Sequence, residues 1–456
     1  MKKMNLNRRT WLKAAAVAVP MAVAGETLGL AGETAANERV KIGVIGLGGR
    51  ANWLMKNTFP QTQGMEWAAV CDIFEPRVQQ FRKNFDGKGV AAYSDFRKMI
   101  DEQKLDGVML ETATHQRAWL AIQVMLAGAN IYLEKPMCLT ISEGRAIANV
   151  AKKLGKVTQV GTQQRSLPLC NWACQQIADG VIGKVQTVIV PNFVGPVPYE
   201  KPDVLDPKDC PEWWNLWTNQ AILRPCLPEI QFGWSRWADY DAGGLCFGVS
   251  GWGTHSLDQA LHAIGTSLTG PTRILLEEPC TIQDSGKYPN RLPDADETGS
   301  PYYGMARVTG PRAKMRLWFE NGVEMQMILD GDRGPGLGCI VVGEKGKIEI
   351  NRHKLASNPK SIVAEMPEEF RNSRDESVYH VENWLHCIRT GEKCSADIEI
   401  GQRSTTLCDL VNLVRATAPV GKEVHWDPQA ERFTDLPEAN ARLSRPRREG
   451  WELPEV

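Results

Sequence analysis

Beyond residue 40, the first third of the chain alternates short apolar runs with amphipathic stretches. The runs predict strands at Lys41–Ile45, Trp67–Cys71, Gly107–Leu110, Asn130–Leu133 and Val157–Val160. Between them, apolar residues at helical spacing predict helices at Pro76–Asn84, Asp95–Asp101, Gln116–Ala127 and Ser142–Lys153. Strands that alternate with helices form βαβ units around a parallel sheet, so we expect an α/β domain that ends near Arg165.

The pattern changes after Arg165. Val185–Phe193 predicts a strand and His255–Ile264 a short helix, and between them a Pro- and Trp-rich segment from Gly195 to Tyr240 predicts a long loop over a functional site. Later strands are predicted at Gly304–Thr309, Ala313–Glu320, Val323–Leu329, Cys339–Val342 and Lys347–Ile350, and helices at Val378–Arg389 and Ile398–Ala416. Consecutive strands without helices between them pair antiparallel, so the second domain is expected to be α+β with a large, mostly antiparallel open sheet.

Composition narrows the function classes. A chain of 456 residues is long enough for two or three domains. A net charge of −1, with no basic run outside the N-terminus, argues against nucleic acid as a partner. The twelve cysteines form no CxxC pair and no metal-ligand cluster, so we expect buried thiols and no metal site. Five tryptophans between Trp213 and Trp237 are either core or a sugar-stacking surface, and the sequence leaves both open.

The N-terminus has the features of an export leader. Basic residues within positions 2–9 precede an apolar run, Ala14 to Ala24, that is too short to span a bilayer securely. Residues 8–13, RRTWLK, resemble the twin-arginine signal. This resemblance implies a signal peptide over residues 1–36, export of an already folded protein to the periplasm or an equivalent space, and no stable membrane span after the leader is removed.

A glycine-rich turn directly follows the first predicted strand. Gly46-Leu47-Gly48-Gly49-Arg50-Ala51 fits the pattern G-x-G-x-x-[GA], which lets backbone N–H groups approach a pyrophosphate. Asp72 ends the second predicted strand, where a carboxylate binds the ribose hydroxyls of adenosine and repels a 2′-phosphate. We therefore expect a dinucleotide-binding domain that holds NAD, with NADP kept as an alternative by the nearby Arg77.

Three later segments carry a family resemblance. They are Glu111–Met137, which contains Glu134-Lys135-Pro136, then Val160–Ser166 and Gly251–Gly265. All three resemble the glucose–fructose oxidoreductase and inositol dehydrogenase family, known as Gfo/Idh/MocA. The resemblance implies a Rossmann domain at 38–165 and a C-terminal domain at 166–456 that binds substrate and joins a homo-oligomer through its sheet. It also implies a carbohydrate substrate: a sugar, glycoside or polyol.

The same resemblance implies roles for individual residues. Lys135 would lie beside nicotinamide and stabilise the substrate oxygen, aimed by a cis Lys135–Pro136 bond, while His255 accepts the hydroxyl proton. Asp258, one helical turn along, would bind a second hydroxyl. The expected catalytic residues are Lys135, His255 and Asp258. The expected cofactor-binding residues are Gly46, Leu47, Gly48, Gly49, Arg50, Ala51, Asp72, Thr112, His115, Glu134, Lys135 and Gln163. The expected substrate-binding residues are Arg165, Trp237, Tyr240, His255 and Asp258.

One position departs from the family pattern. Family dehydrogenases typically carry an aspartate four residues before the histidine that corresponds to His255, and this chain has Gly251 there. Asp239, Tyr240 or Asp241 from the preceding loop could replace that carboxylate, and the sequence does not choose among them. The departure keeps a catalytically silent sugar-binding homologue as an alternative function.

The leader and the glycine turn together constrain the reaction. An exported enzyme cannot exchange its nicotinamide cofactor with the cytoplasmic pool, so net oxidation would stop after one turnover. We therefore expect tightly bound NAD and a redox-neutral cycle, either paired sugar oxidation and reduction or a glycosidase-like route through a transient 3-keto sugar, which the family resemblance implies. The alternative is a plain NAD-dependent sugar or polyol dehydrogenase, including one whose leader stays uncut.

Overall fold

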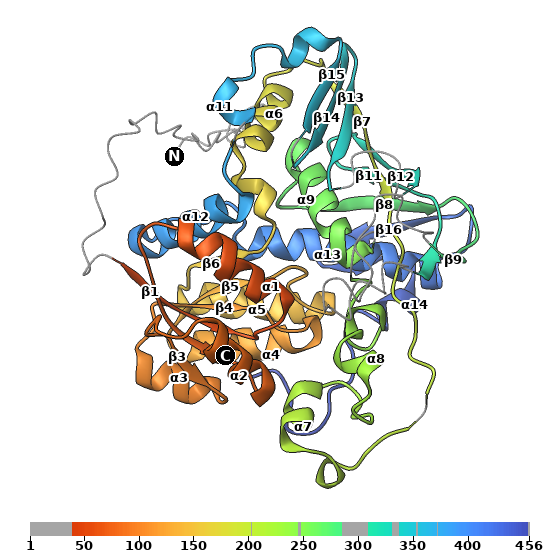
Figure 1. Cartoon of the computed structure of the whole chain (residues 1–456). Helices are drawn as coiled ribbons and strands as arrows, with labels where there is room; N and C mark the ends of the chain where they lie inside the picture. Colours follow the sequence, from red (N-terminus) through yellow and green to blue (C-terminus); the bar gives the residue numbers. More distant parts are fainter. Residues whose placement is uncertain are drawn as a thin grey trace, which may run out of the picture.

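The computed structural model describes residues 39–201, 203–244, 248–284, 309–330, 337–352, 354–371 and 373–454. The leader lies outside these residues, as does most of the strand expected at Gly304–Thr309. Within them, the chain forms an N-terminal domain with a parallel sheet and a C-terminal domain with a larger sheet, which lie side by side (Figure 1). In the described part of the chain, no helix has the length and apolar character needed to cross a membrane.

The N-terminal sheet has six parallel strands in the order β3-β2-β1-β4-β5-β6, which confirms the α/β prediction. Its strands are β1 (Val40–Ile45), β2 (Met65–Cys71), β3 (Ala91–Tyr93), β4 (Gly107–Leu110), β5 (Asn130–Leu133) and β6 (Thr158–Val160). Its helices are α1 (Gly49–Trp53), α2 (Glu75–Asn84), α3 (Phe96–Gln103), α4 (Thr114–Leu126) and α5 (Ile141–Leu154). The sequence pattern does not reveal β3, because its three half-buried residues are too few to give a periodic signal.

The carboxyl ends of four strands bring the motif residues to one edge of this sheet. Gly46 follows β1, Asp72 follows β2, Glu111 follows β4 and Glu134 follows β5. β4 is buried along its whole length, as strands covered on both faces are. Open parallel sheets bind ligands outside the carboxyl ends of their strands, so the fold presents these four residues where a ligand is expected.

The C-terminal sheet has nine strands in the order β15-β14-β13-β7-β12-β11-β8-β16-β17. Its strands are β7 (Val185–Asn192), β8 (Pro271–Leu276), β11 (Met315–Phe319), β12 (Glu324–Asp330), β13 (Cys339–Gly343), β14 (Gly346–Asn351), β15 (Lys354–Asn358), β16 (Glu423–Asp427) and β17 (Arg432–Phe433), with β9 (Thr281–Asp284) and β10 (Thr309–Arg312) pairing beside it. The sheet is antiparallel except between β7 and β12, which confirms the α+β prediction.

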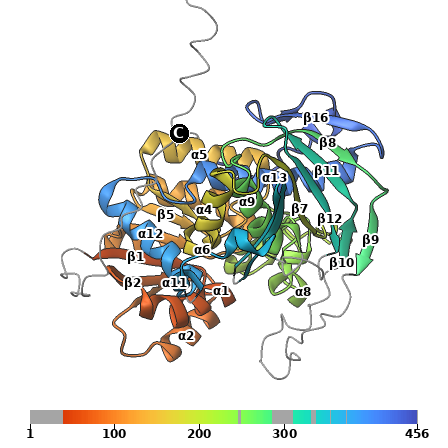
Figure 2. The ribbon, with the colours of Figure 1, turned by 90° about the horizontal axis from the view of Figure 1, so that it is seen from above.

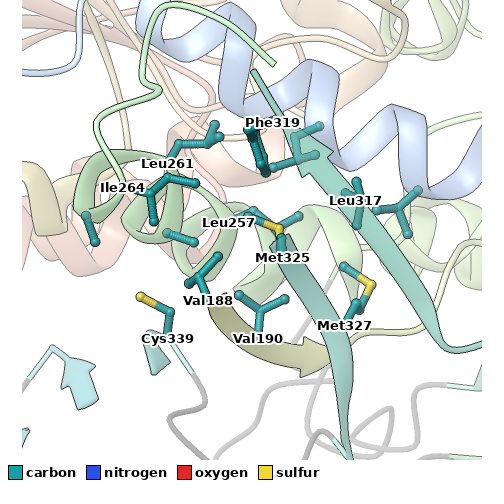
Figure 3. Packing of buried hydrophobic residues seen from close by; sticks show 14 of the residues in the cluster. Val188, Val190, Leu257, Leu261, Ile264, Leu317, Phe319, Met325, Met327 and Cys339 are labelled. Atoms are coloured by element: carbon teal, nitrogen blue, oxygen red, sulfur yellow. The ribbon is translucent and has the colours of Figure 1, made fainter. Parts of the chain in front are cut away.

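Helices cover one face of this sheet. They are α6 (Pro168–Ala178), α9 (Thr254–Ala263) and α13 (Ile398–Thr417), on the side toward the N-terminal domain (Figure 2), with the short α11 (Glu368–Arg371) and α14 (Pro437–Asn440) nearby. Leu257 and Leu261 of α9 pack with Val188 and Met325 of the sheet (Figure 3). On the other face β11 presents partly exposed residues such as Arg316, which pairs with Glu277 and Glu324.

A helix from the other end of the chain completes the N-terminal domain. α12 (Glu376–Thr390) crosses back to it, and Val381 and Trp384 enter the cluster that contains Val44 and Met109. The side chains of Val381 and Trp384 are both fully buried there. The two domains are therefore joined by shared packing as well as by the chain connection.

The Trp-rich segment is partly helical rather than a long loop. It forms α7 (Glu212–Thr218) and α8 (Pro228–Gln231), and a cluster around Trp214 and Trp217 packs it onto the N-terminal domain. These two indoles stack with ring centroids 4.7 Å apart, and Trp214 is fully buried. Trp214 is thus core, whereas Trp213 also lines a cavity.

Candidate active site and cofactor groove

A cavity of about 990 Å³ runs along the carboxyl edge of the parallel sheet and between the two domains. The glycine turn, the ends of β2, β4 and β5, helix α7, the segment before α9 and the end of the chain all contribute to it. Its lining includes Gly46, Gly48, Gly49, Arg50, Asp72, Glu111, Thr112, Arg117, Glu134, Lys135, Gln163, Trp213, Asp241, Gly251, His255, Arg352 and Trp451. Nine of the twelve expected cofactor residues are in this list.

The glycine turn leaves room for a ligand close to the backbone. Gly46 has a φ of +93°, and a Cβ there would lie 3.0 Å from the backbone of Glu111. A Cβ on Gly48 or Gly49 would meet no atom within 4 Å, so the chain here faces open cavity. A pyrophosphate that binds backbone N–H groups needs this free approach, so the turn fits the expected dinucleotide.

The Asp72 carboxylate is held in place at the end of β2. It accepts hydrogen bonds from the backbone N–H groups of Leu47 at 2.8 Å and Phe74 at 2.9 Å, and the Arg77 guanidinium lies 3.6 Å away. A fixed carboxylate that lines the groove is an acceptor for ribose hydroxyls and repels a phosphate. Leu47 thus supports the site through its backbone amide.

Two carboxyl groups lie close together where β4 and β5 end. Glu134 accepts hydrogen bonds from Arg50 Nε at 2.8 Å and from Gln163 Nε2 at 3.0 Å. Burial opposes the ionisation of Glu134, but the positive charges of Arg50 and Lys135 outweigh burial and lower its pKa. Glu111 has no hydrogen-bond partner at either oxygen, and burial together with Glu134 raises its pKa to about 8. A buried polar group without a partner is costly, so Glu111 fits a ligand that supplies a hydroxyl or amide there.

Lys135 marks the other end of the cavity. The Lys135–Pro136 peptide bond is cis, as expected. The Lys135 Nζ donates a hydrogen bond to the backbone oxygen of Gly251 at 3.0 Å. Burial lowers the pKa of Lys135, while Glu134 and Asp241 act in the opposite direction. Gly251, the position that departs from the family pattern, therefore contacts Lys135 through its backbone.

The structure separates the three candidates for the missing carboxylate. Asp239 forms an ion pair with Arg224 at 2.6 Å, and Tyr240 is fully buried among the α7 aromatics. Asp241 lines the cavity, accepts a hydrogen bond from Ser250 Oγ at 2.6 Å, and leaves its Oδ1 without a partner. Burial raises the pKa of Asp241, while Ser250 and Lys135 lower it. Of the three, Asp241 is the residue that lines the cavity.

His255 lies at the start of α9 with its ring in the cavity. Its Nδ1 has no hydrogen-bond partner. Burial, and then Arg352 and Lys135, keep the pKa of His255 well below 6.5, so the imidazole is neutral at neutral pH. Arg352 pairs with Glu376 at 2.5 Å, while its Nε and one Nη have no partner. A neutral base beside free guanidinium donors suits a ligand rich in hydroxyl groups.

Asp258 and Arg165 do not line the cavity. Arg165 Nε lies 2.8 Å and 2.9 Å from the two carboxylate oxygens of Asp258, and Ser404 Oγ also donates to that carboxylate. Both side chains are almost fully buried, at 3% and 1% exposed. Asp258 lies on the same helix as His255, as expected, but its carboxylate contacts Ser404 of α13 and not the cavity. The expected substrate contacts of both residues are therefore corrected to a structural ion pair.

Five other expected contacts, Leu47, Ala51, His115, Trp237 and Tyr240, also lie outside the cavity lining. Ala51 is buried in the core beneath the glycine turn. His115 Nε2 lies 2.9 Å from the backbone oxygen of Trp217, and its ring packs on Trp217 and Tyr240. Trp237 donates from its indole to the Glu229 backbone at 2.8 Å. His115 therefore fixes the Trp-rich segment on the N-terminal domain, and the indole N–H of Trp237 is used within that segment.

The cavity also contains residues that no sequence pattern indicated, including Glu111, Arg117, Arg352 and Trp451. Glu111 directly follows a predicted strand, which is a signal that could have been used. Arg352 and Trp451 are far from every motif and carry no such signal. Only the folded chain brings them to the groove.

Comparison with known proteins assigns the family. Residues 40–162 match a model described as "Oxidoreductase family, NAD-binding Rossmann fold", and residues 305–453 match "Oxidoreductase family, C-terminal alpha/beta domain". Together the two models cover more than half of the chain. The chain belongs to the Gfo/Idh/MocA oxidoreductase family. Residues 40–162 form an NAD(H)-binding Rossmann domain, which agrees with the fit of the glycine turn, Asp72 and Glu111.

Individual Gfo/Idh/MocA relatives are distant. The scyllo-inositol 2-dehydrogenase (NAD(+)) of Bacillus subtilis is 28% identical over 147 residues, 32% of this chain and 42% of that protein. A glycosyl hydrolase family 109 protein of Solibacter usitatus is 29% identical over 125 residues, 25% of this chain and 28% of that protein. The chain thus spans less than half the length of either curated relative.

Solved structures of other proteins share this fold. The WlbA dehydrogenase from Bordetella pertussis, in complex with NADH and UDP-GlcNAcA, aligns with a TM-score of 0.57 at 16% identity. The alignment covers 86% of this chain and 98% of that one. Both domains of this Gfo/Idh/MocA chain therefore follow the family fold.

Proposed function

We propose that this protein is an exported NAD-dependent enzyme that acts on a hydroxyl group of a sugar, glycoside or polyol, in a redox-neutral cycle with tightly bound cofactor. The observation that supports the reaction type is the convergence of Lys135, Asp241 and His255 on the cavity that contains the glycine turn. A cation, a carboxylate and a neutral imidazole around one space can together remove the proton of an alcohol and stabilise the oxygen as the alcohol is oxidised.

Each of these residues has a role in moving the hydroxyl proton. When bound, NAD⁺ would supply the acceptor for a hydride from the substrate carbon. The hydroxyl must lose its proton as the hydride leaves, because an alkoxide is the better hydride donor. His255, neutral because burial lowers its pKa, accepts that proton, and Lys135 stabilises the oxygen that carries the negative charge. Asp241, fixed by Ser250, balances the charge of Lys135 and completes the proton path.

Two observations favour a redox-neutral cycle over net oxidation. The RRTWLK leader predicts export to a space without a free cofactor pool. One relative, matched over 25% of this chain, is a glycosyl hydrolase family 109 protein, a class whose name describes bond cleavage by water without net oxidation. A plain dehydrogenase is the second candidate, favoured by the similarity to scyllo-inositol 2-dehydrogenase.

The redox-neutral route uses the same residues. Oxidation at C3 of a sugar makes the C2 proton acidic, so that the C1 substituent can be eliminated. The leaving group takes up a proton, and water adds across the double bond, with its hydroxyl at C1 and a proton at C2. The C3 ketone would then be reduced again by the hydride that the bound cofactor had taken. His255 and Asp241 are the cavity groups that can take and return the C2 proton, because neither is committed to an ion pair within the described residues. In the paired alternative, a second sugar takes the hydride instead.

The test is turnover without added cofactor. We expect the purified protein to contain NAD, to convert a sugar or glycoside with none supplied, and to exchange deuterium from solvent into C2. Lys135→Ala and His255→Ala should each lower turnover by about 10²–10⁴-fold while NAD stays bound. The matched controls are Lys83→Ala and His386→Ala, both at exposed positions away from the cavity, which should keep wild-type turnover.

Other outcomes would select the alternatives. Turnover only with continuously supplied NAD, yielding one keto sugar per NADH, would establish a plain dehydrogenase. Bound sugar without any turnover would indicate a silent binding protein. Export is tested separately: replacing Arg8 and Arg9 with lysine should keep the precursor in the cytoplasm, and unchanged export would contradict the twin-arginine proposal.

A further inference from the structure

The end of the chain returns to the N-terminal domain and reaches the cofactor groove. After α14, residues 445–454 cross to the Rossmann domain, beside which the C-terminus lies in both views (Figures 1 and 2). Arg447 donates to the Glu143 carboxylate of α5, and Leu453 packs against the core cluster of that domain. This tail, residues 445–454, is therefore docked by defined contacts.

Within the tail, Gly450 and Trp451 line the groove. The Trp451 ring packs edge-on against Trp119 of α4 with centroids 5.0 Å apart, and Trp119 packs in the same way on Phe96. Arg447 Nε donates to the backbone oxygen of Trp451 at 2.6 Å, which fixes the position of that residue. Trp451 thus belongs to the wall of the cavity.

Strand order shows which half of the groove Trp451 borders. Asp72 ends β2, and the next strand outward is β3, followed by the lining residues Ser94 and Phe96. Lys135 lies on the opposite side, after β5. Because the carboxylate after β2 binds the adenosine ribose, the β3 side holds the adenine half of a dinucleotide. Trp451 contacts Trp119, and Trp119 in turn contacts Phe96 of that half.

The tail is also fastened to α7, which covers the same groove. The Arg448 guanidinium donates to Asn215 Oδ1 at 2.8 Å and to backbone oxygens of Asn215 and Asn219, at 3.1 Å and 2.5–2.8 Å. α7 contributes Trp213 to the lining, where it packs on Phe74 with centroids 4.7 Å apart. One arginine therefore joins two segments, far apart in sequence, that cover the cofactor groove.

We propose that the tail is part of the NAD site: Trp451 closes the adenosine half of the groove, and Arg448 fastens the tail to α7 so that the dinucleotide is retained between turnovers. Release of the cofactor then requires the Arg448 hydrogen bonds to break and the tail or α7 to move. An enzyme in a space without free NAD must keep its bound NAD from one turnover to the next. The inference depends on NAD binding by the Rossmann domain and not on which reaction the enzyme performs.

The experiment measures NADH release directly. NADH is loaded on the full-length mature protein, and its dissociation is followed by fluorescence after addition of excess NAD⁺. We expect Arg448→Ala, Trp451→Ala and a chain ending at Glu449 to release NADH at least about tenfold faster than wild type. Trp451→Phe, which keeps a flat ring, should stay within about threefold. Arg374→Ala is the control for loss of an exposed arginine that pairs only at the surface.

A second measurement separates local from general damage. Trp451→Ala should weaken binding of AMP, which fills the adenosine half, and leave binding of nicotinamide mononucleotide unchanged. Wild-type release rates in both Arg448→Ala and Trp451→Ala would overturn the proposal, as would equal losses for both ligand halves. Failure of the wild-type protein to bind NADH would instead contradict the cofactor assignment itself.

Discussion

The ion pair between Arg165 and Asp258 gives the sharpest test of how the site is divided into structural and catalytic residues. Both side chains are buried, at 3% and 1% exposed, and Asp258 receives hydrogen bonds from Arg165 and Ser404. Asp258→Asn keeps the size of the side chain but removes its charge. The Arg165 guanidinium then stays buried without a counter-charge, and breaking a buried pair in this way costs about 3–5 kcal/mol.

Guanidinium denaturation followed by circular dichroism measures this loss. Asp258→Asn should lower the unfolding free energy of the C-terminal domain by about 3–5 kcal/mol, while Asp101→Asn, at an exposed position, should change it by less than about 0.5 kcal/mol. The double variant Arg165→Met/Asp258→Leu should recover much of the loss, because buried pairs are often replaceable by apolar side chains.

Turnover decides between the two roles. Folded Asp258→Asn should retain turnover within about threefold of wild type, because Asp258 does not line the cavity. Wild-type stability combined with a loss of turnover of about 100-fold or more would refute this reasoning and return Asp258 to the catalytic residues.

Three further predictions concern the cavity. Asp241→Asn should lower turnover by about 10²-fold or more with NAD retained, whereas Asp101→Asn should not; equal activities would exclude Asp241 from the proton path. Asp72→Ala should reduce the preference for NAD over NADP in binding assays, and an unchanged preference would contradict its ribose contact. The pKa of His255 is held well below 6.5, so its imidazole stays neutral as the pH falls from 7 to about 6. Protonation of His255 should therefore cause no loss of kcat over this range. An acid limb of the kcat profile near 6.5 that disappears in His255→Ala would falsify this assignment.

Local sequence determined the cofactor half of the site. A glycine turn, a carboxylate after β2 and the Glu134-Lys135-Pro136 segment each depend on a few consecutive residues that follow a strand. Strand and helix periodicity also predicted five strands of each sheet, because alternating burial repeats over short distances; it missed β3 in the parallel sheet and β8, β15, β16 and β17 in the larger one. In a parallel sheet the carboxyl ends of strands meet at one edge, so these local features could be placed together before the structure was known.

Only tertiary structure decided which side chains face the cavity elsewhere. Asp239, Tyr240 and Asp241 are consecutive, yet one forms an ion pair, one enters the core and one lines the site. Loop dihedral angles and distant partners such as Arg224 determine these directions, and neither has a periodic signal. The pair of Arg165 with Asp258 and the packing of Trp451 on Trp119 join positions far apart in the chain. Such contacts form because the folded chain buries surface and satisfies charges over long sequence separations, which a local pattern does not encode.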